Sequence, residues 1–208
     1  MRPTIVVEHL EPEMSLWILL EYRHAGLIVG DRDMLWFTNI PARYKKILYK
    51  YGRVCDKSIL ELVPQEKIVI LDPQAEKPLT YGDLLGKYVV IGGILGDYPP
   101  RGRTKELLSS RAPRAEKRNI GEGQYSIDGT VYYVMYLWKH GSINGFKHVD
   151  GVKINTNEGH IFLPFRYPVE DNKPVLAPGL KEYLLFKRVP DHILKEILSN
   201  EIIEDEKN

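Results

Sequence analysis

One short segment constrains the fold of this chain more than any other: an apolar run that opens into glycines, prolines and charge. Residues 88–91 read Tyr-Val-Val-Ile, which is typical of a strand buried on both faces of a parallel sheet. Residues 92–104, with the sequence GGILGDYPPRGRT, follow at once. Their first three glycines permit a sharp turn or a close approach to a ligand. Open α/β sheets bind ligands at the carboxyl ends of their strands, so we favour a binding site here over an ordinary Gly-Pro surface loop.

Strands and short helices alternate along the first two thirds of the chain. Further strands are expected at 4–9, 35–38, 67–71 and 118–120, and helices at 42–51, 58–63 and 127–140. Ser15 and Thr80 are placed to cap two more helices, because such side chains accept the free N–H groups of a first helical turn. Another helix is expected to begin near Thr104. This alternation predicts an α/β fold with a mostly parallel sheet.

The last third of the chain has a different texture. Residues 152–155 and 160–163 flank a Thr-Asn-Glu-Gly turn, and this pattern predicts a hairpin. Prolines from Pro164 to Pro178 predict a loop after it. Helices near 179–187 and 191–198 and a charged tail at 201–208 are expected to follow. Since no repeat or linker is visible, we expect a single domain over 1–208, with 151–200 packed on the rest.

The composition excludes several classes of protein. The 208 residues are 43% hydrophobic and 27% charged, enough for both a core and a solvated surface. The single cysteine, Cys55, rules out an internal disulfide or a cysteine-based metal cluster. His148, His160 and His192 are too scattered to predict a metal site. We see no signal peptide and no apolar stretch of membrane-spanning length. We therefore expect a cytoplasmic protein without a membrane partner.

The charge pattern leaves nucleic-acid binding open only as a local property. The net charge is +1, so there is no overall attraction to a polyanion. Residues 101–118 hold seven lysines or arginines against two glutamates, and residues 42–53 hold five among three tyrosines. Basic side chains beside aromatic rings suit phosphate contact and base stacking. A solvated helix face is the commoner explanation for such charge runs.

Several groups of residues, in order along nearly the whole chain, resemble one family. The most specific is segment 92–104. The others are 8–13 with 17–22, Leu71-Asp72-Pro73, 118–121 with Gln124, 164–167, and 172–176 with 178–179. The chain is similar to a SPOUT-class methyltransferase family. That family includes the yeast enzyme that methylates an arginine of a small-subunit ribosomal protein, together with its archaeal relatives.

The resemblance implies a fold, a cofactor and a set of binding residues. The fold is the SPOUT-type α/β fold, a mostly parallel sheet flanked by helices with a trefoil knot in the carboxyl half. The cofactor is S-adenosylmethionine, the product is S-adenosylhomocysteine, and the protein is a monomer or a homodimer. Carried over position by position, the cofactor-binding residues are Leu71, Asp72, Pro73, Gly92, Gly93, Ile94, Leu95, Gly96, Asp97, Asn119, Ile120, Gly121, Gln124, Tyr125 and Ser126.

An arginine substrate narrows the search for catalytic residues to carboxylates. A guanidinium carries a charge with a pKa above about 12, so a carboxylate must hold it and take its proton. Glu8 at the end of the first strand and Glu21 on the following helix are candidates, with a solvated surface charge as the even alternative. Asp97 directly follows the glycines and is the third candidate. For Glu11 and Glu13 we expect surface charges.

The sequence allows more than one role for two arginines and one aspartate. Arg101 and Arg103 are candidate substrate-binding residues that suit an RNA phosphate, an acidic protein patch or the carboxylate of the cofactor. Asp72 is as easily a turn residue before Pro73 as a cofactor contact. The leading hypothesis is methylation of a protein arginine on a ribosomal or translation component. RNA methylation is the alternative, and a non-catalytic RNA- or ribosome-binding module is the third.

Overall fold

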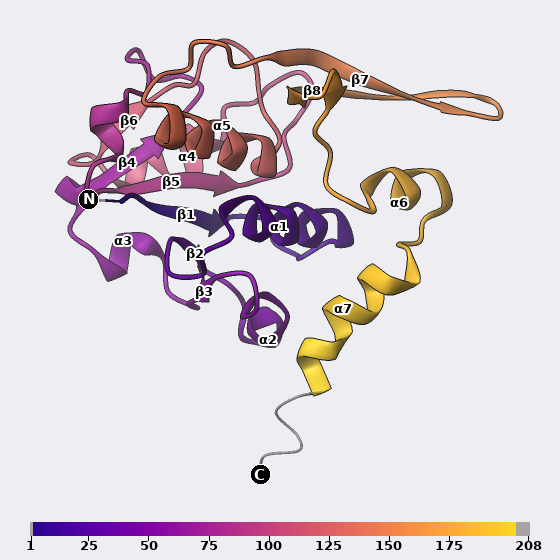
Figure 1. Ribbon diagram of the computed structural model, residues 1–208. Helices are drawn as coiled ribbons and strands as arrows, with labels where there is room; N and C mark the ends of the chain where they lie inside the picture. The colour runs from indigo at the N-terminus through magenta and orange to yellow at the C-terminus, as the bar shows by residue number, and fades with distance from the viewer. Residues whose placement is uncertain (1, 203–208) are drawn as a thin grey trace.

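Six parallel strands form the central sheet. The computed structural model in Figure 1 describes residues 2–202, with side chains up to Leu198. The strands are β1 (Thr4–His9), β2 (Leu35–Thr38), β3 (Arg53–Val54), β4 (Ile68–Leu71), β5 (Tyr88–Gly93) and β6 (Glu116–Arg118). Their order is β3-β2-β1-β5-β4-β6, and every neighbouring pair is parallel. The predicted mostly parallel α/β sheet is confirmed, and the carboxyl ends of the six strands lie at one edge.

Helical segments cover both faces of this sheet. They are α1 (Leu16–Val29), α2 (Lys45–Leu48), α3 (Ile59–Leu62), α4 (Arg103–Leu107), α5 (Ile127–His140), α6 (Leu180–Phe186) and α7 (Asp191–Ile202), with 3-10 turns η1 (Ala42–Tyr44), η2 (Gln65–Lys67), η3 (Tyr81–Leu84) and η4 (Ser109–Arg111). Ile5 and Val7 pack in one core cluster with α1, α2 and α5. Val6 packs in a second cluster with α3 and the segment after α4. The alternation along β1 thus sends its side chains to two separate cores.

The predicted helix caps are present. Ser15 accepts the N–H of Ile18 at 3.2 Å and begins α1. Thr80 and Asp83 form a capping box at η3. The helix predicted at 127–140 is confirmed despite its β-branched residues, because Val131 and Val134 are fully buried in the core cluster. Packing of an apolar face outweighs the weak intrinsic preference of valine.

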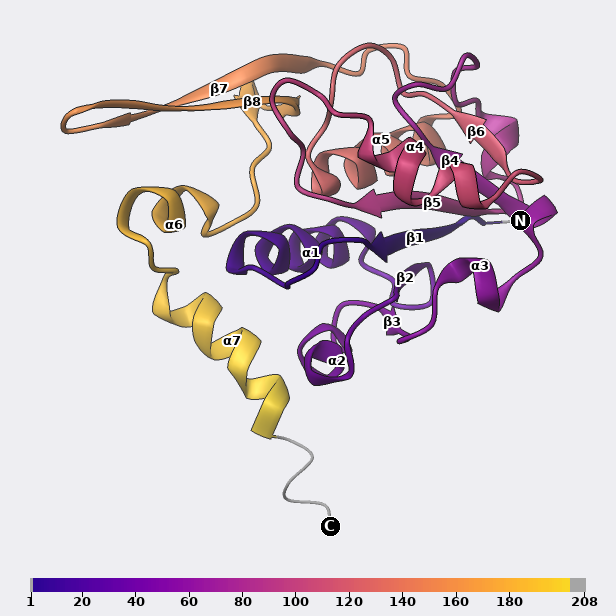
Figure 2. The same cartoon turned by 180° about the vertical axis from the view of Figure 1, so that it is seen from behind.

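A long hairpin projects from the body of the molecule, as Figures 1 and 2 show. It consists of β7 (His148–Thr156) and β8 (Gly159–Glu170), with the short β9 (Lys173–Pro174) beside β8. The loop predicted from Pro164 onward is wrong, because β8 runs through Pro164 to Glu170. The register skips between the pairs Asp150–Arg166 and Val152–Leu163. Pro164 therefore falls in a bulge, where its missing N–H removes no ladder bond.

Two other sequence expectations need correction. The helix expected at 42–51 is a 3-10 turn followed by the four residues of α2. A helix of four residues is too short to form the long basic face that the sequence indicated. The strand expected at 118–120 lies two residues earlier, at β6. The charged tail expected at 201–208 falls almost wholly outside the described residues.

Gly93 and Gly96 in segment 92–104 are needed for close approach rather than for a turn. Gly92 and Gly93 continue β5 opposite Glu8 and His9 of β1, so the strand ends two residues later than predicted. A Cβ on Gly93 would lie 2.0 Å from the Tyr22 hydroxyl oxygen. A Cβ on Gly96 would lie 2.5 Å from a ring carbon of Phe165. Larger residues would push α1 and β8 away from this edge of the sheet.

Within residues 2–202, the helices lack the combined length and apolar character that crossing a membrane requires.

Candidate active site

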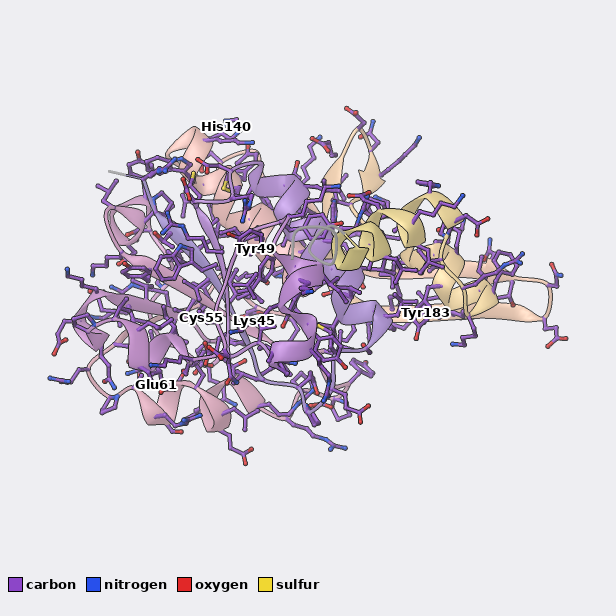
Figure 3. The ribbon with its side chains drawn as sticks, turned by 90° about the horizontal axis from the view of Figure 1, so that it is seen from below. Lys45, Tyr49, Cys55, Glu61, His140 and Tyr183 are labelled. Atoms are coloured by element: carbon purple, nitrogen blue, oxygen red, sulfur yellow. The ribbon has the colours of Figure 1, made fainter. Side chains whose placement is uncertain are left out.

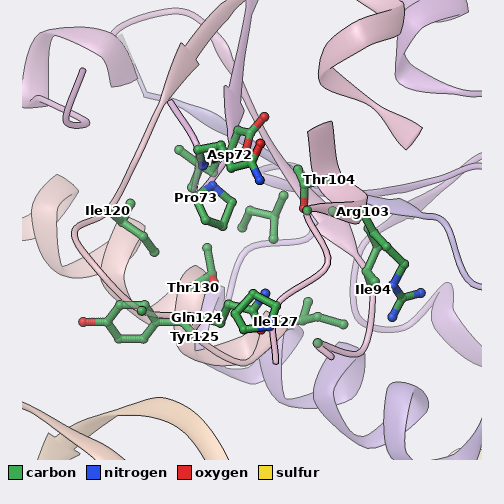
Figure 4. A pocket seen from close by; sticks show the side chains of 18 of the residues that line it. Asp72, Pro73, Ile94, Arg103, Thr104, Ile120, Gln124, Tyr125, Ile127 and Thr130 are labelled. Carbon is green, nitrogen blue, oxygen red and sulfur yellow. Dashed lines mark hydrogen bonds between the residues drawn. The ribbon is translucent and has the colours of Figure 1, made fainter. Parts of the chain in front are cut away.

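Three loops at the carboxyl edge of the sheet enclose an open cleft of about 910 Å³. The loops follow β4, β5 and β6, and the first turn of α5 closes the floor. Figure 4 shows Asp72 and Pro73 on one side of the cleft, Ile94 and Arg103 on another, and Tyr125 on a third. This position is the usual one for a ligand in an open α/β sheet.

Most of the predicted cofactor residues line this cleft. Those that do are Leu71, Asp72, Pro73, Gly92, Ile94, Gly96, Asp97, Ile120, Gly121, Gln124 and Tyr125. Arg101 and Arg103 line it as well. Residues as far apart in the sequence as Leu71 and Tyr125 are therefore brought together at one site.

The remaining four predicted residues lie behind the cleft and support it. Gly93 makes room for Tyr22. The backbone N–H of Leu95 donates to Glu11 at 2.9 Å. The Asn119 side chain donates to the Ala75 carbonyl at 2.9 Å and accepts the Gly121 N–H at 3.0 Å. Ser126 caps α5 by accepting the N–H of Gly129 at 3.1 Å.

The structure adds lining residues that the sequence reasoning missed. They are Gln74, Ile91, Pro100, Gly102, Thr104, Gly123, Ile127 and Thr130. Ile127 and Thr130 are three positions apart at the start of α5, so they share one helix face. That spacing was visible in the sequence and was the available signal. The contribution of Gln74 depends on the path of the loop after β4, which has no comparable signal.

Arg103 connects the loop after β5 to the segment that follows β1. Its Nε donates to Asp97 at 2.7 Å, and its NH1 donates to Glu11 at 2.9 Å. It also donates to the Leu95 carbonyl. The expectation that Glu11 is a solvated surface charge is therefore wrong, because its carboxylate is shared between Arg103 and the Leu95 N–H. Glu13 is exposed, as expected.

Strand β8 supports two of the three loops from outside. The N–H of Arg166 donates to the Gln124 carbonyl at 2.7 Å, and the Arg166 guanidinium carbon lies 5.8 Å from the centre of the Tyr125 ring. Phe165 packs against Gly96 in the loop after β5. The base of the projecting hairpin is therefore part of the cleft wall's support.

Asp72 makes the predicted turn contact and also lines the cleft, and its contact with the cofactor stays a prediction. One carboxylate oxygen accepts the N–H of Gln74 at 2.9 Å, which is a turn contact after Pro73. The other accepts the Ser109 hydroxyl at 2.6 Å. The side chain is buried and lines the cleft. A carboxylate fixed on two sides is well placed to accept a further bond from a ligand hydroxyl.

Glu21 lies directly behind the floor of the cleft. It is only 2% exposed. Its carboxylate accepts the Trp17 indole N–H at 2.6 Å and the backbone N–H of Ile127 at 3.0 Å. Burial raises the pKa of Glu21 to about 8, and the nearby charge of Asp128 adds to the rise. At neutral pH most Glu21 carboxyls therefore hold a proton, and a mildly basic carboxylate forms above that range.

Glu8 lies on the other face of the sheet, away from the cleft lining. It is 1% exposed and accepts bonds from the Thr38 hydroxyl and, at 3.0 Å, from the N–H of Ile59. Ile59 is the first residue of α3. The structure thus brings Glu21 to the site and does not bring Glu8 there, and a role of Glu8 in proton transfer stays a prediction.

The lining chemistry fits a nucleoside-bearing sulfonium. Leu71, Ile94 and Ile120 give apolar walls, and Asp72 and Asp97 give negative charge. A Cβ on Gly92 would point between Ile94 Cδ1 and Thr104 Oγ1, at 3.4 and 3.5 Å. Both residues line the cleft, so a side chain at Gly92 would fill space that a ligand needs.

Solved structures with the same fold define the class of protein. The crystal structure of the yeast arginine methyltransferase SFM1 complexed with SAH matches with a TM-score of 0.76 at 28% identity, over 87% of this chain and 94% of that chain. The SAM complex matches with a TM-score of 0.76 at 27% identity, over 88% and 90%. A Trm10 from Thermococcus kodakaraensis shares the fold at a TM-score of 0.57 and 16% identity, over 69% and 96%. Fold and cleft together define a SPOUT-class, S-adenosylmethionine-dependent methyltransferase.

The sequence identifies the family. Residues 4–189 match the family described as protein arginine N-methyltransferase SFM1-like, and the chain belongs to that family. The protein arginine N-methyltransferase SFM1 of Saccharomyces cerevisiae is 29% identical over 197 residues, which is 86% of this chain and 92% of the yeast protein. The predicted resemblance, SPOUT-type fold, methyltransferase activity and cofactor are confirmed. The trefoil knot and the single-domain boundary stay predictions.

Proposed function

We propose that this enzyme methylates an arginine side chain of a protein, and that the target is a ribosomal or translation component. The observation that carries the proposal is the match of residues 4–189 to an arginine N-methyltransferase family, since it includes all three cleft loops. When bound, S-adenosylmethionine supplies a methyl group on a sulfonium, and its transfer leaves S-adenosylhomocysteine. The three loops are the residues that hold this cofactor.

Residues at the edge of the cleft position the loop after β5 and bind charged groups of the cofactor or substrate. Arg103 holds Asp97 and the loop after β5 in place. The second oxygen of Asp97 forms no hydrogen bond with any described residue, so it remains available to the sulfonium or to a guanidinium. Arg101 lines the cleft and has no ion pair among residues 2–198, which suits a carboxylate of the cofactor or of the substrate.

Glu21 is the proton acceptor in this proposal. A guanidinium nitrogen that gains a methyl group must give up one proton. An arginine guanidinium in solution is too weak an acid to lose that proton at neutral pH. Glu21 is adjacent to the cleft through Ile127, and its burial makes it a stronger base than a surface glutamate. A base with a pKa near the working pH is the efficient choice for this step.

One assay separates the candidate functions. Cell extract from a strain that lacks the protein is incubated with the enzyme and methyl-labelled cofactor, and the product is treated with protease or nuclease. We expect protease to release the label, and amino-acid analysis to find it on arginine. Release by nuclease would establish RNA methylation instead. Absence of label from every fraction, with cofactor binding intact by calorimetry, would favour a non-catalytic binding module.

A further inference from the structure

A buried histidine–aspartate pair lies next to Glu21 at the interface of α1 and α5. Asp128, the second residue of α5, is 2% exposed. One of its oxygens accepts the N–H of Gly129 at 2.9 Å, and the other lies 2.6 Å from Nδ1 of His24. His24 follows Glu21 by three residues on α1, so the two side chains share the helix face that meets the start of α5.

Two carboxylates therefore converge on one helix end. Glu21 accepts the N–H of Ile127, and Asp128 accepts the N–H two residues later. The free N–H groups and the positive end of the helix dipole favour both anions there. The anions also repel each other, which favours a proton on one of them. Nδ1 of His24 lies 2.6 Å from Asp128, whereas burial and the neighbouring Asp128 raise the pKa of Glu21, which favours a proton on Glu21.

A second cavity, which shares no lining residue with the cofactor cleft, lies next to this pair. His24 lines this cavity together with Tyr132, Tyr136, Lys139, His140 and Glu170. His140, at the end of α5, lies at the edge of the molecule in Figure 3.

Other titratable groups facing Glu21 come from α1 and β8. Tyr22 and Tyr167 are both buried, and burial, followed by nearby carboxylates including Glu21, raises the pKa of each hydroxyl further above its ordinary value. Both phenols therefore stay neutral across the range in which Glu21 titrates. Asp128 is then the group on α5 whose charge bears most directly on Glu21.

We propose that Asp128, oriented by His24, is a positioning residue that makes Glu21 a stronger proton acceptor for the methylation step. The inference rests on the proposed function. When Glu21 is ionised, the guanidinium nitrogen bonds to the methyl carbon while the carbon–sulfur bond of the donor breaks and S-adenosylhomocysteine leaves. The proton lost by that nitrogen passes to a Glu21 oxygen, one proton per methyl group. A fixed negative charge at Asp128 strengthens the affinity of Glu21 for that proton, and reaction rate follows base strength.

The test uses the isolated protein and needs no turnover. The carboxyl carbons of the glutamates are labelled with ¹³C, the Glu21 signal is assigned with Glu21→Gln, and its titration is followed by NMR. We expect a midpoint near pH 8 in the parent protein. In Asp128→Asn the midpoint should fall by about one unit or more, the usual effect of removing a like charge at short range. His24→Gln should produce a smaller shift in the same direction.

Glu170→Gln is the matched control, because Glu170 lines the second cavity with His24 but lies outside the Glu21 contacts. It should leave the midpoint unchanged. An unmoved Glu21 midpoint in folded Asp128→Asn would overturn the proposal. The pH profile of methylation is measured in parallel. A rising limb that moves to lower pH in Asp128→Asn supports a role in catalysis, whereas a uniform loss at every pH reveals a merely structural residue and contradicts it. Failure of the proposed function would appear separately, as no methylation by the parent protein.

Discussion

Glu8 and Glu21 lie in two regions of the molecule that have the same local arrangement but different surroundings. Each glutamate is almost fully buried, and each accepts the N–H of the first residue of a helix, Ile59 for Glu8 and Ile127 for Glu21. Glu8 lies on the face covered by α3, where its other partner is the neutral Thr38 hydroxyl. Glu21 lies on the face covered by α5, beside Asp128 and behind the cleft floor.

Burial and a helix end therefore do not by themselves identify a catalytic carboxylate. What separates the two glutamates is the second neighbour and the distance to the cleft. At Glu8 the carboxylate connects β1 to β2 and to α3. At Glu21 the nearby Asp128 adds to the rise of the pKa, and the adjacent Ile127 lines the cleft.

The largest expected effect is on activity. Glu21→Gln keeps the shape of the side chain but removes the proton acceptor, so methyl transfer should fall by about a hundredfold or more, while cofactor affinity stays within about threefold. Glu8→Gln is the paired variant and should lose less than about tenfold. Rates from labelled cofactor and affinities from calorimetry measure both. Equal losses in the two variants would break the distinction between the regions.

A second effect concerns stability against pH. An unfolded glutamate loses its proton near pH 4.5, whereas folded Glu21 keeps its proton to about pH 8. Between these values the folded state holds a proton that the unfolded state has lost. The unfolding free energy should therefore fall as pH rises through this window, on the order of 1.4 kcal/mol for each unit of pKa difference. Urea unfolding at a series of pH values measures this slope.

Variants localise the slope to one region. Glu21→Gln has no carboxyl to titrate, so its stability should decline less over the same window. Glu8→Gln should keep the decline of the parent protein. If Glu8→Gln flattened the curve instead, the strongly perturbed carboxyl would lie under α3 rather than under α5.

The smallest effects are expected from removing one hydrogen-bond donor of Glu21 and one of Glu8. Trp17→Phe removes a donor that favours the charged form of Glu21. A bond worth about 1 kcal/mol corresponds to roughly 0.7 of a pKa unit, so the activity profile should move to higher pH by about that amount. Thr38→Val should cost about 1–3 kcal/mol of stability and leave the profile in place. A shift produced by Thr38→Val would contradict the separation of roles.

The sequence was sufficient for five of the six strands of the sheet and for most of the cleft, because these depend on local signals, whereas β3 and the strand order were not predicted. Apolar runs mark buried strands, and the segment after β5 carries glycines wherever a neighbour approaches closely. Contacts between residues far apart in the sequence could not be predicted from local patterns. Glu11 looked like a surface charge because Arg103, its partner, is 92 residues away in the sequence. Pro164 looked like a loop residue because the bulge that accommodates it depends on the register of β7. The face on which Glu8 lies depends on where α3 packs, which no local pattern records.

The support that β8 gives to the cleft limits how this enzyme can be shortened. A fragment ending at His140 would retain all six strands of the parallel sheet and every residue that lines the cofactor cleft. It would lack Phe165 and Arg166, which hold the loops after β5 and β6 from outside. Such a fragment should lose affinity for the methyl donor although every contacting residue is present. The smallest functional unit therefore extends well past the last cofactor-lining residue.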